Sequence, residues 1–392
     1  MNGTILAVFA FVYAAMLLGR LPRLQLDRTG AALLGAIVLL ATGAVTLDGA
    51  GDAVHVPTLA LLFGLMVVSA QLRLGGFYSR VSRALAELPL SPPGLLGVTI
   101  LAVGALSAVF SNDIVCLAVA PVLIEGCERR GTDPVPFLLA LACAANVGSA
   151  ATLIGNPQNM LVGQTLGLSF AGYLADAALP SLLGLAATWG IIAFEQHGRW
   201  RGAGQGAPAP PREGDPLEPI PAFDAWQTAK GLGVAAALLT SRKLHSRRML
   251  GLVDWQLLVL FMGLFVVNDA LAATGLPERA VAWLAERGLD PARPTWLFAL
   301  CVLLSNAVSN VPAVMLLLPV AHHELAGPVL ALASTLAGNL FLVGSIANLI
   351  VVDAAAQRGI ALDWRRHART GVPVTLATLA IAAACLAWSA RG

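Results

Sequence analysis

The sequence predicts an all-α polytopic membrane protein made of two inverted-topology repeats, each with a re-entrant helical hairpin and a broken transmembrane helix. Hydrophobic residues make up 57% of the 392 residues and charged residues only 12%, which is more apolar side chain than a water-soluble fold can bury. The tripeptide Ser111-Asn112-Asp113 recurs as Ser309-Asn310-Val311, 198 residues later (309 − 111). A membrane chain that carries a polar signature twice is typical of two related halves around one site.

Uninterrupted apolar runs are expected to cross the bilayer as helices. A crossing takes about 20 residues, and the period-two alternation of barrel strands is absent. The first run has no basic start and no small-residue cleavage site, so we expect an anchor and not a signal peptide. The predicted runs are 4–19, 29–47, 57–74, 173–194, 255–273 and 371–389.

Charged loops predict the orientation of these runs. Arg20, Arg23 and Arg28 follow the first run, whereas Asp48 and Asp52 follow the second. Because basic loops stay in the cytoplasm, we expect the first loop to be cytoplasmic and the amino terminus to lie on the outer side. We take the membrane to be the inner membrane of the cell.

The apolar region 92–126 is interrupted by the first polar tripeptide. We expect neither arm to span comfortably, and the loops on both sides are basic, so the region predicts a re-entrant hairpin that enters and leaves on the cytoplasmic face. Ser111 and Asn112 are favoured N-caps and would end one arm and begin the next. Free N–H groups at such a tip attract anions, and the carbonyls that end the preceding arm attract cations.

The apolar region 135–165 is interrupted by Gly155-Asn156-Pro157. Glycine permits an unwound backbone, asparagine caps, and proline suits the first turn of a restarted helix. The sequence therefore predicts a helix broken near the middle of the membrane, with polar groups freed by the break that need partners.

The second half repeats this pattern in the same order. Gly64 aligns with Gly263 at a spacing of 199 (263 − 64), and Gly155 aligns with Gly344 at 189 (344 − 155). Inverting the second half would bring both hairpin tips and both breaks to one polar cavity. The second-half regions are 295–324, interrupted at Asn306 to Pro312, and 328–357, interrupted at Gly344 to Asn348.

We divide the chain into a first repeat at 1–196, a linker at 197–228 and a second repeat at 229–392. The linker is rich in proline and glycine without periodicity, and we expect it in the cytoplasm. The second repeat is shortened at its start, because the weak run Gly231–Leu239 is too short to cross. We expect that run to be a partial or interfacial helix, leaving eight full crossings with both termini outside.

At these motifs the chain resembles the ion transporter superfamily that includes arsenite permeases, sodium/proton antiporters and divalent-anion/sodium symporters. SNDIVCLAVAP, TLIGNPQN, SNVPAVMLLLP and VGSIAN resemble its paired signatures, and the match looks closest to the bacterial anion-permease branch. The resemblance covers nearly the whole chain except the linker and the missing helix. It implies that tips and breaks form the substrate and coupling-ion sites of a homodimer that works by an elevator movement.

The resemblance also implies roles for individual residues. A possible Na⁺ site involves Ser111, Asn112 and Gly155, and its pseudo-symmetric partner involves Ser309, Asn310 and Gly344. The expected substrate-binding residues are Asn112, Asp113, Asn156, Pro157, Asn310, Val311 and Ser345. The expected cation-coupling residues are Ser111, Asn112, Asp113, Gly155, Ser309, Asn310 and Gly344. The residues expected to shape the helix breaks are Thr152, Asn159, Pro312 and Asn348.

One departure from the family pattern concerns the third tip position. The dicarboxylate symporters carry Ser-Asn-Thr at both tips, whereas this chain has Asp113 and Val311. A carboxylate repels an anion unless it is protonated or paired with a cation. The departure argues against a dicarboxylate substrate and makes Asp113 a hypothetical carrier of a proton or cation; a structural helix cap is the alternative.

The predicted function is secondary active transport of a small inorganic or organic anion, coupled to Na⁺ or H⁺. A sodium/proton antiporter or an arsenite efflux permease fits the same motifs. An ion channel or an intramembrane enzyme is disfavoured, because the duplication suits alternating access and no nucleophile, histidine and acid cluster lies in the apolar runs. We expect no cofactor beyond the coupling ion, and no nucleic acid partner, because the basic residues lie in short loops.

Overall fold

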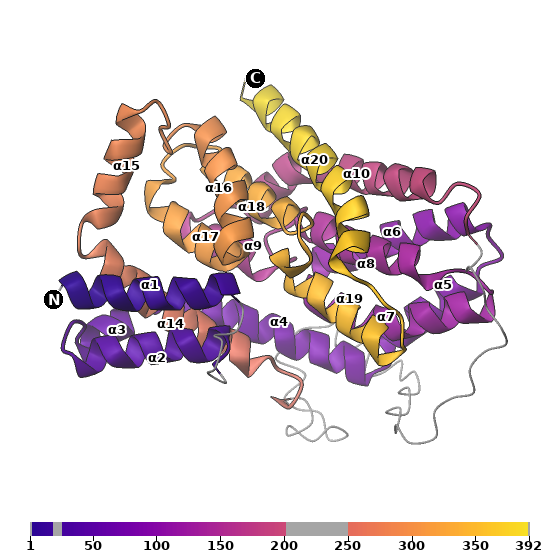
Figure 1. Cartoon of the computed structure of the whole chain (residues 1–392), viewed down its shortest axis with the longest axis horizontal. Helices are drawn as coiled ribbons and strands as arrows, with labels where there is room; N and C mark the ends of the chain where they lie inside the picture. Colours follow the sequence, from indigo (N-terminus) through magenta and orange to yellow (C-terminus); the bar gives the residue numbers. More distant parts are fainter. Residues whose placement is uncertain (1, 19–25, 201–249, 391–392) are drawn as a thin grey trace.

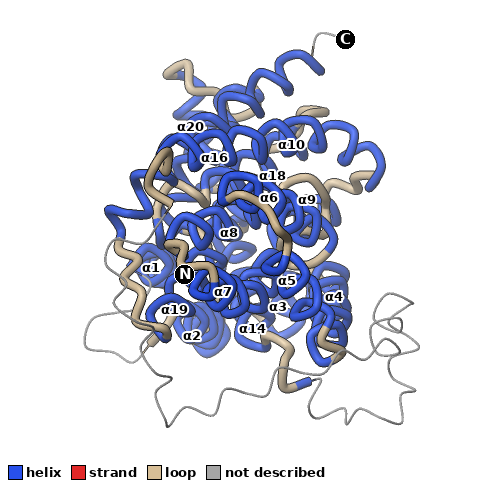
Figure 2. Tube along the Cα trace, turned by 90° about the vertical axis from the view of Figure 1, so that its right-hand side faces the viewer, coloured by secondary structure: helices blue, strands red, loops and turns tan. Residues whose placement is uncertain are grey.

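The computed structural model describes residues 2–18, 26–200 and 250–390, and the regular elements in those ranges are all helices (Figures 1 and 2). The all-α prediction is therefore confirmed. The first half comprises α1 (Asn2–Leu18), α2 (Arg28–Ala41), α3 (Leu47–Ala53), α4 (Val56–Leu74), α5 (Phe77–Glu87), α6 (Pro92–Val109), α7 (Asn112–Arg129), α8 (Pro134–Ser149), α9 (Pro157–Thr165) and α10 (Phe170–Glu195). The second half comprises α14 (Trp255–Ala272), α15 (Leu276–Glu286), α16 (Pro294–Val308), α17 (Asn310–Leu317), the 3₁₀ turn η1 (Leu318–Val320), α18 (Ala326–Ala337), the 3₁₀ turn η2 (Leu342–Gly344), α19 (Ile346–Gln357) and α20 (Trp364–Ser389).

The two halves repeat one order of elements. From α4 to α10 a long helix is followed by a short one, a helix pair joined at a polar tip, a helix pair joined by an irregular segment, and a second long helix. The same order runs from α14 to α20. The predicted linker from residue 201 onward and the predicted partial helix Gly231–Leu239 lie outside the described residues.

Five of the described helices are long and apolar enough to cross a membrane, namely α4, α6, α10, α14 and α20. One predicted crossing is wrong in its extent: the run 29–47 does not form one long helix, because α2 ends at Ala41. Gly43 follows with φ 68° and donates its N–H to the Leu40 carbonyl, while Ala44 donates to Leu39. This is the glycine-dependent helix ending that a β-carbon would disfavour. At about 1.5 Å per residue, α2 spans only about 21 Å.

The first hairpin arm also differs from expectation. We expected neither arm to be long enough to span, but α6 has 18 residues and meets the length and composition of a membrane span. Its return arm α7 has 18 residues as well, and Pro121 lies inside it without ending it. The second return arm is shorter: α17 has 8 residues, and Pro319 lies in the 3₁₀ turn that follows. The hairpins are therefore unequal.

Helices from different halves pack closely where small residues face each other. α2 packs on α14, and α10 packs on α20 (Figure 1). A Cβ atom at Gly263 of α14 would lie 2.7 Å from the carbonyl oxygen of Ala32 on α2. Within the first half, a Cβ atom at Gly148 of α8 would lie 2.3 Å from the Gly104 carbonyl oxygen of α6. Small residues of this kind let membrane helices approach at backbone distance.

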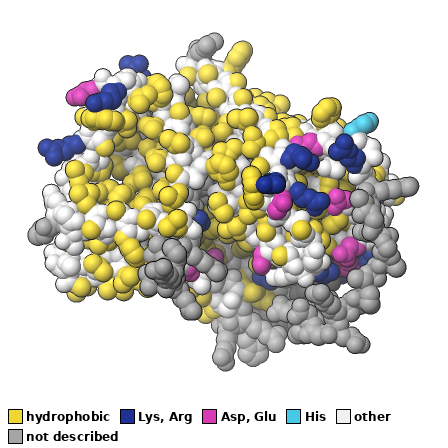
Figure 3. Space-filling view, viewed as in Figure 1, with side chains coloured by type: hydrophobic (Ala, Val, Ile, Leu, Met, Phe, Trp, Pro, Cys, Tyr) yellow, Lys and Arg dark blue, Asp and Glu magenta, His cyan; other side chains and the backbone are white. Residues whose placement is uncertain are grey.

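The outer surface fits a bilayer environment. Hydrophobic side chains cover the left and centre of the face shown in Figure 3, while charged side chains gather at its right-hand side and upper left corner. Large apolar side chains remain exposed on several long helices, among them Leu182 of α10 at 59% and Leu376 of α20 at 62%. Such exposure is unfavourable in water and favourable in lipid.

Substituting Gly148 tests the α6–α8 contact. We expect Gly148→Ala to destabilise the protein by about 1–3 kcal/mol, because the added carbon meets backbone that cannot rotate away. The measurement is thermal unfolding of the purified protein in detergent. Gly190→Ala on α10 is the matched control, since a Cβ atom there meets nothing within 4 Å; equal midpoints for the two variants would contradict the packing argument.

Candidate functional site

The two hairpin tips are single-residue or two-residue interruptions between helices. α6 ends at Val109 and α7 begins at Asn112, while α16 ends at Val308 and α17 begins at Asn310. The backbone N–H of Asn112 donates to the Gly155 carbonyl over 3.2 Å, which ties the first tip to the first helix break. The asparagine of each tip thus opens a helix.

Ser111 lies between the two arms of the first hairpin and Asn112 begins the second arm, as predicted, but the serine side chains make no capping hydrogen bond. Ser111 and Ser309 occupy the N-cap positions of α7 and α17. Ser111 instead lines a cavity. Ser309 has φ 80° and ψ 158°, and it is the one residue other than glycine with positive φ in the part of the chain that the structure describes. That conformation costs on the order of 1–3 kcal/mol and typically marks a functional position.

The two helix breaks follow the expected local chemistry. Asn156 accepts a hydrogen bond from the Asn159 N–H over 2.9 Å, and Pro157 is the first residue of α9. In the second half, Ser345 accepts from the Ala347 N–H over 3.2 Å and caps α19 without a proline. Each break therefore restarts its helix with a side-chain oxygen on the first free N–H groups.

One asparagine in each half stabilises the helix break with the same pair of hydrogen bonds. The side-chain amides of Asn159 and Asn348 each donate to two carbonyls at the end of the interrupted helix or just after it. These bonds run from Asn159 Nδ2 to Ser149 O (3.3 Å) and Thr152 O (2.9 Å), and from Asn348 Nδ2 to Gly338 O (2.8 Å) and Phe341 O (3.2 Å). The donor and both acceptors of the second break each lie 189 positions after those of the first (348 − 159). The repeat therefore extends to individual hydrogen bonds.

Side chains of each half also form hydrogen bonds with the helix break of the other half. Asn146 of α8 bonds to the second break, and Thr335 of α18 bonds to the first, again 189 residues apart (335 − 146). The bonds are Asn146 Nδ2 to Asn348 Oδ1 (3.3 Å), Ser345 Oγ to Asn146 Oδ1 (2.9 Å), Thr335 Oγ1 to Asn159 Oδ1 (3.2 Å) and Asn156 Nδ2 to Thr335 Oγ1 (3.1 Å). We call these buried side chains, with Asn112, Asn310 and Asn339, the amide cluster.

Both hairpin tips reach the amide cluster. Asn112 Nδ2 donates to Asn146 Oδ1 over 3.0 Å, and Asn146 donates to Asn339 Oδ1 over 2.7 Å. A Cβ atom at Gly338 would lie 3.2 Å from Asn310 Nδ2. Asn112 is 5% exposed and Asn310 8%. The structure therefore gathers both tips and both breaks in one buried polar centre.

Several oxygens of this centre have no donor. Asn112 Oδ1, Asn306 Oδ1, Asn310 Oδ1 and Ser107 Oγ are buried, and each lacks a hydrogen-bond partner within the described residues. Buried oxygens of this kind are costly unless a donor or a cation meets them. Amide, hydroxyl and carbonyl oxygens are also the ligands that hard cations prefer.

The glycines of the two breaks allow backbone carbonyl oxygens to approach the helix breaks closely. A Cβ atom at Gly155 would lie 2.3 Å from the Ser149 carbonyl oxygen and 2.8 Å from that of Ser107. A Cβ atom at Gly344 would lie 3.0 Å from the Gly338 carbonyl oxygen. Glycine is required at position 155, because a backbone carbonyl occupies the space of a side chain, and the fit at position 344 is tight.

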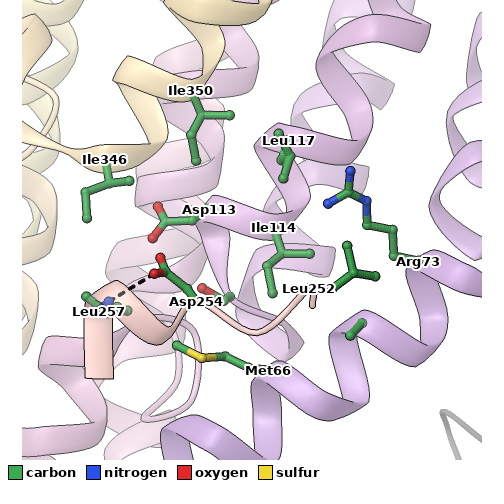
Figure 4. A pocket seen from close by; sticks show the side chains of 12 residues that line it. Met66, Arg73, Asp113, Ile114, Leu117, Leu252, Asp254, Leu257, Ile346 and Ile350 are labelled. Carbon is green, nitrogen blue, oxygen red and sulfur yellow. Dashed lines mark hydrogen bonds between the residues drawn. The ribbon is translucent and has the colours of Figure 1, made fainter. Parts of the chain in front are cut away.

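Asp113 lies outside the amide cluster. Its side chain lines a separate cavity of about 130 Å³ between α4, α7, α19 and the start of α14, together with Ser111, Arg73 and Asp254 (Figure 4). Val311 is buried at the start of α17, and the Pro312 carbonyl accepts from the Tyr13 hydroxyl of α1 over 3.5 Å. No group of three or more His, Cys, Asp or Glu side chains that could hold a metal occurs in the described ranges.

Asn146, Thr335 and Asn339 form much of the amide cluster, and their sequence context did not predict this role. The available signal was spacing, because Asn146 and Thr335 share the offset of 189 that relates Gly155 to Gly344. Their residue types differ, so a comparison of identical motifs does not pair them. Asn339 has no polar counterpart at that offset, since position 150 is alanine.

An all-helical membrane fold with paired tips and breaks around a buried polar centre defines a polytopic transporter. Comparison with known proteins specifies the group: the family model described as citrate transporter matches residues 11–337, and the chain belongs to this family. The resemblance to the ion transporter superfamily is thereby confirmed. The protein is a membrane transporter with a small-molecule substrate, and not an enzyme.

Individual relatives agree with this assignment. The silicon efflux transporter LSI3 of Oryza sativa is 28% identical over 92% of both chains. The inner membrane protein YbiR of Escherichia coli is 33% identical over 79% of this chain and 82% of its own. The crystal structure of the YdaH transporter of Alcanivorax borkumensis, described as having an unusual topology, superposes with a TM-score of 0.55 at 15% identity over 99% of this chain and 97% of its own. At that identity the likeness shows the fold.

A double-mutant cycle tests the exchange of hydrogen bonds between the halves. We expect Asn146→Ala and Asn348→Ala each to lower the free energy of unfolding by about 1–3 kcal/mol, because each leaves buried partners unsatisfied. The double variant should lose less than the sum, with a coupling of about 0.5–3 kcal/mol. The measurement is chemical or thermal unfolding in detergent. Strict additivity would show that the two side chains do not interact.

Proposed function

We propose that the protein is a secondary active transporter that moves a small inorganic or organic anion across the inner membrane by alternating access, coupled to Na⁺ or H⁺. The observation that carries the proposal is the exchange of hydrogen bonds between the two broken helices at the amide cluster. Broken helices of two related halves around one buried polar centre are the architecture of secondary transporters.

The helix starts around the amide cluster support an anionic substrate. α7, α9, α17 and α19 all begin at cluster residues or directly after them. The first N–H groups of a helix and its positive dipole end attract negative charge without a charged side chain. We propose that Asn112, Asn156, Asn310 and Ser345 orient the substrate there, with Pro157 and Val311 shaping the same region.

The donor-free oxygens support two cation positions. We propose one beside the first tip and break, formed by Ser111, Asn112 and Gly155, and a second formed by Ser309, Asn310 and Gly344. Asn112 Oδ1 and Asn310 Oδ1 are buried without a donor in the described part of the chain, and the glycines admit carbonyl oxygens. Such oxygen sets suit Na⁺, while Asp113 supplies the one carboxylate at either tip that could carry H⁺.

The proposed transport movement is of the elevator type within a homodimer, as the superfamily resemblance implies. We propose that the hairpins and broken helices move together against α1, α2 and α14. The unequal hairpins and the strained Ser309 lie where such a movement would need a bistable element. In this arrangement both termini lie outside, and the segment 197–228 lies in the cytoplasm.

A substrate panel in proteoliposomes tests the proposed function. The probes are citrate, phosphate, sulfate, arsenite and silicic acid, with Na⁺ and H⁺ gradients imposed separately. We expect saturable uptake of at least one probe, driven uphill by one gradient, and at least about a tenfold loss in Asn112→Ala and Asn310→Ala, since each removes about 1.4 kcal/mol or more of binding.

Gln357→Ala provides the matched control, because this side chain is exposed and its one hydrogen bond to the described residues is to Asp353, over 3.0 Å. Uptake by that variant should equal the wild-type rate. Flux that rises linearly with concentration and never runs uphill would identify a channel and contradict the proposal. Uptake of none of the five probes would also count against it.

A further inference from the structure

The cavity beside the first hairpin joins two carboxylates from different halves of the chain. Asp113 lies in the first turn of α7, and Asp254 directly precedes α14. Figure 4 shows their carboxylate groups next to each other and directed into the same space, with Arg73 further along the cavity. The volume of about 130 Å³ leaves room for water.

Asp254 is held as an acceptor. Its carboxylate caps α14 by accepting the Leu257 N–H over 2.9 Å. An aspartate carboxylate is ordinarily ionised at neutral pH. Asp254 therefore presents a fixed negative charge to the cavity.

Asp113 faces the negative charge of Asp254 and has no stabilising polar partner among the described side chains. No hydrogen bond or ion pair joins it to another side chain among the described residues, and neither aspartate forms a salt bridge with Arg73 there. The residues that α19 contributes to the cavity cannot offset a second negative charge. From α19 the cavity receives Ile346 and Ile350, which are apolar.

The remaining titratable groups near Asp113 lie on the helices packed against α7. Cys116 is one turn along α7 itself, and Cys143 is on α8; both thiols are buried. Arg80 and Arg83 belong to α5, which also packs on α7, and neither lines the cavity. Two like charges at close range in such surroundings repel strongly unless one site takes a proton.

We propose that Asp113 and Asp254 form one proton-binding pair, in which a proton on the Asp113 carboxylate relieves its repulsion with the Asp254 carboxylate. When the hairpin moves away from α14, Asp113 loses the repulsive neighbour and stays beside the first N–H groups of α7, which favour a carboxylate. The O–H bond then breaks and the proton passes to water in the cavity. This inference rests on the proposed function, because it assigns H⁺ as a coupling ion, and it makes Asp254 a positioning residue that acts through Asp113.

Infrared spectroscopy of the purified full-length protein in lipid tests the pair without any substrate. A pH titration should show a carboxylic acid C=O band that disappears as pH rises, and Asp113→Asn should remove that band. Asp254→Asn should keep the band but weaken the proton affinity roughly tenfold, so that the midpoint falls by about one pH value. The sign follows because Asn still caps α14 but carries no charge to raise the cost of ionising Asp113.

Asp353→Asn is the control, since Asp353 is on α19, outside the cavity, and accepts from Gln357. Its titration should match the wild type. A band that survives Asp113→Asn, or a midpoint that Asp254→Asn leaves unchanged, would overturn the pair.

Transport gives the second readout. For any probe that the wild type takes up, Asp254→Asn should move the pH profile of uptake by the same amount toward low pH. If the wild type takes up no probe, the proposed function fails while the infrared titration still decides on the pair. A normal pH profile in Asp254→Asn with active uptake would overturn the pair alone.

Discussion

The exchange of side-chain hydrogen bonds between the two broken helices is the constraint on which the rest of the structure depends. A helix interrupted inside a membrane leaves carbonyl and N–H groups that lipid cannot satisfy. Asn159 and Asn348 satisfy the carbonyls within their own half, while Asn146 and Thr335 each bond to the break of the other half. Neither break is complete alone, so each half stabilises the polar centre of its partner and fixes where the two meet.

The two halves are alike at their helix breaks and differ at their hairpins. The first tip has Asp113, an unstrained Ser111 and a return helix of 18 residues; the second has Val311, a strained Ser309 and a return helix of 8 residues. The shared amide cluster offers one place for a substrate. We propose that the first hairpin binds a proton and that the second changes conformation, so the two halves need not perform the same task.

Local chemistry made much of the fold predictable from the sequence. Composition indicates a membrane protein, and Gly155-Asn156-Pro157 predicts a break because each residue has a backbone preference of its own. Other features depend on distant partners. Asn146 bonds to a residue 202 positions away. The proposed role of Asp254 depends on Asp113, which lines the same cavity. Ser111 occupies the N-cap position that its propensity predicts, but its side chain makes no capping hydrogen bond.

The most direct test of the account is a disulfide between the halves at the amide cluster. In a chain whose five native cysteines are replaced, Asn146→Cys combined with Asn348→Cys should cross-link on oxidation, because α8 packs on α19 and Asn146 Nδ2 lies 3.3 Å from Asn348 Oδ1. After proteolytic cleavage at a site introduced within 201–249, the halves should run as one band on a non-reducing gel, whereas Asn146→Cys with Gln357→Cys should give two. Two bands from the first pair under the same oxidation would contradict the joined polar centre.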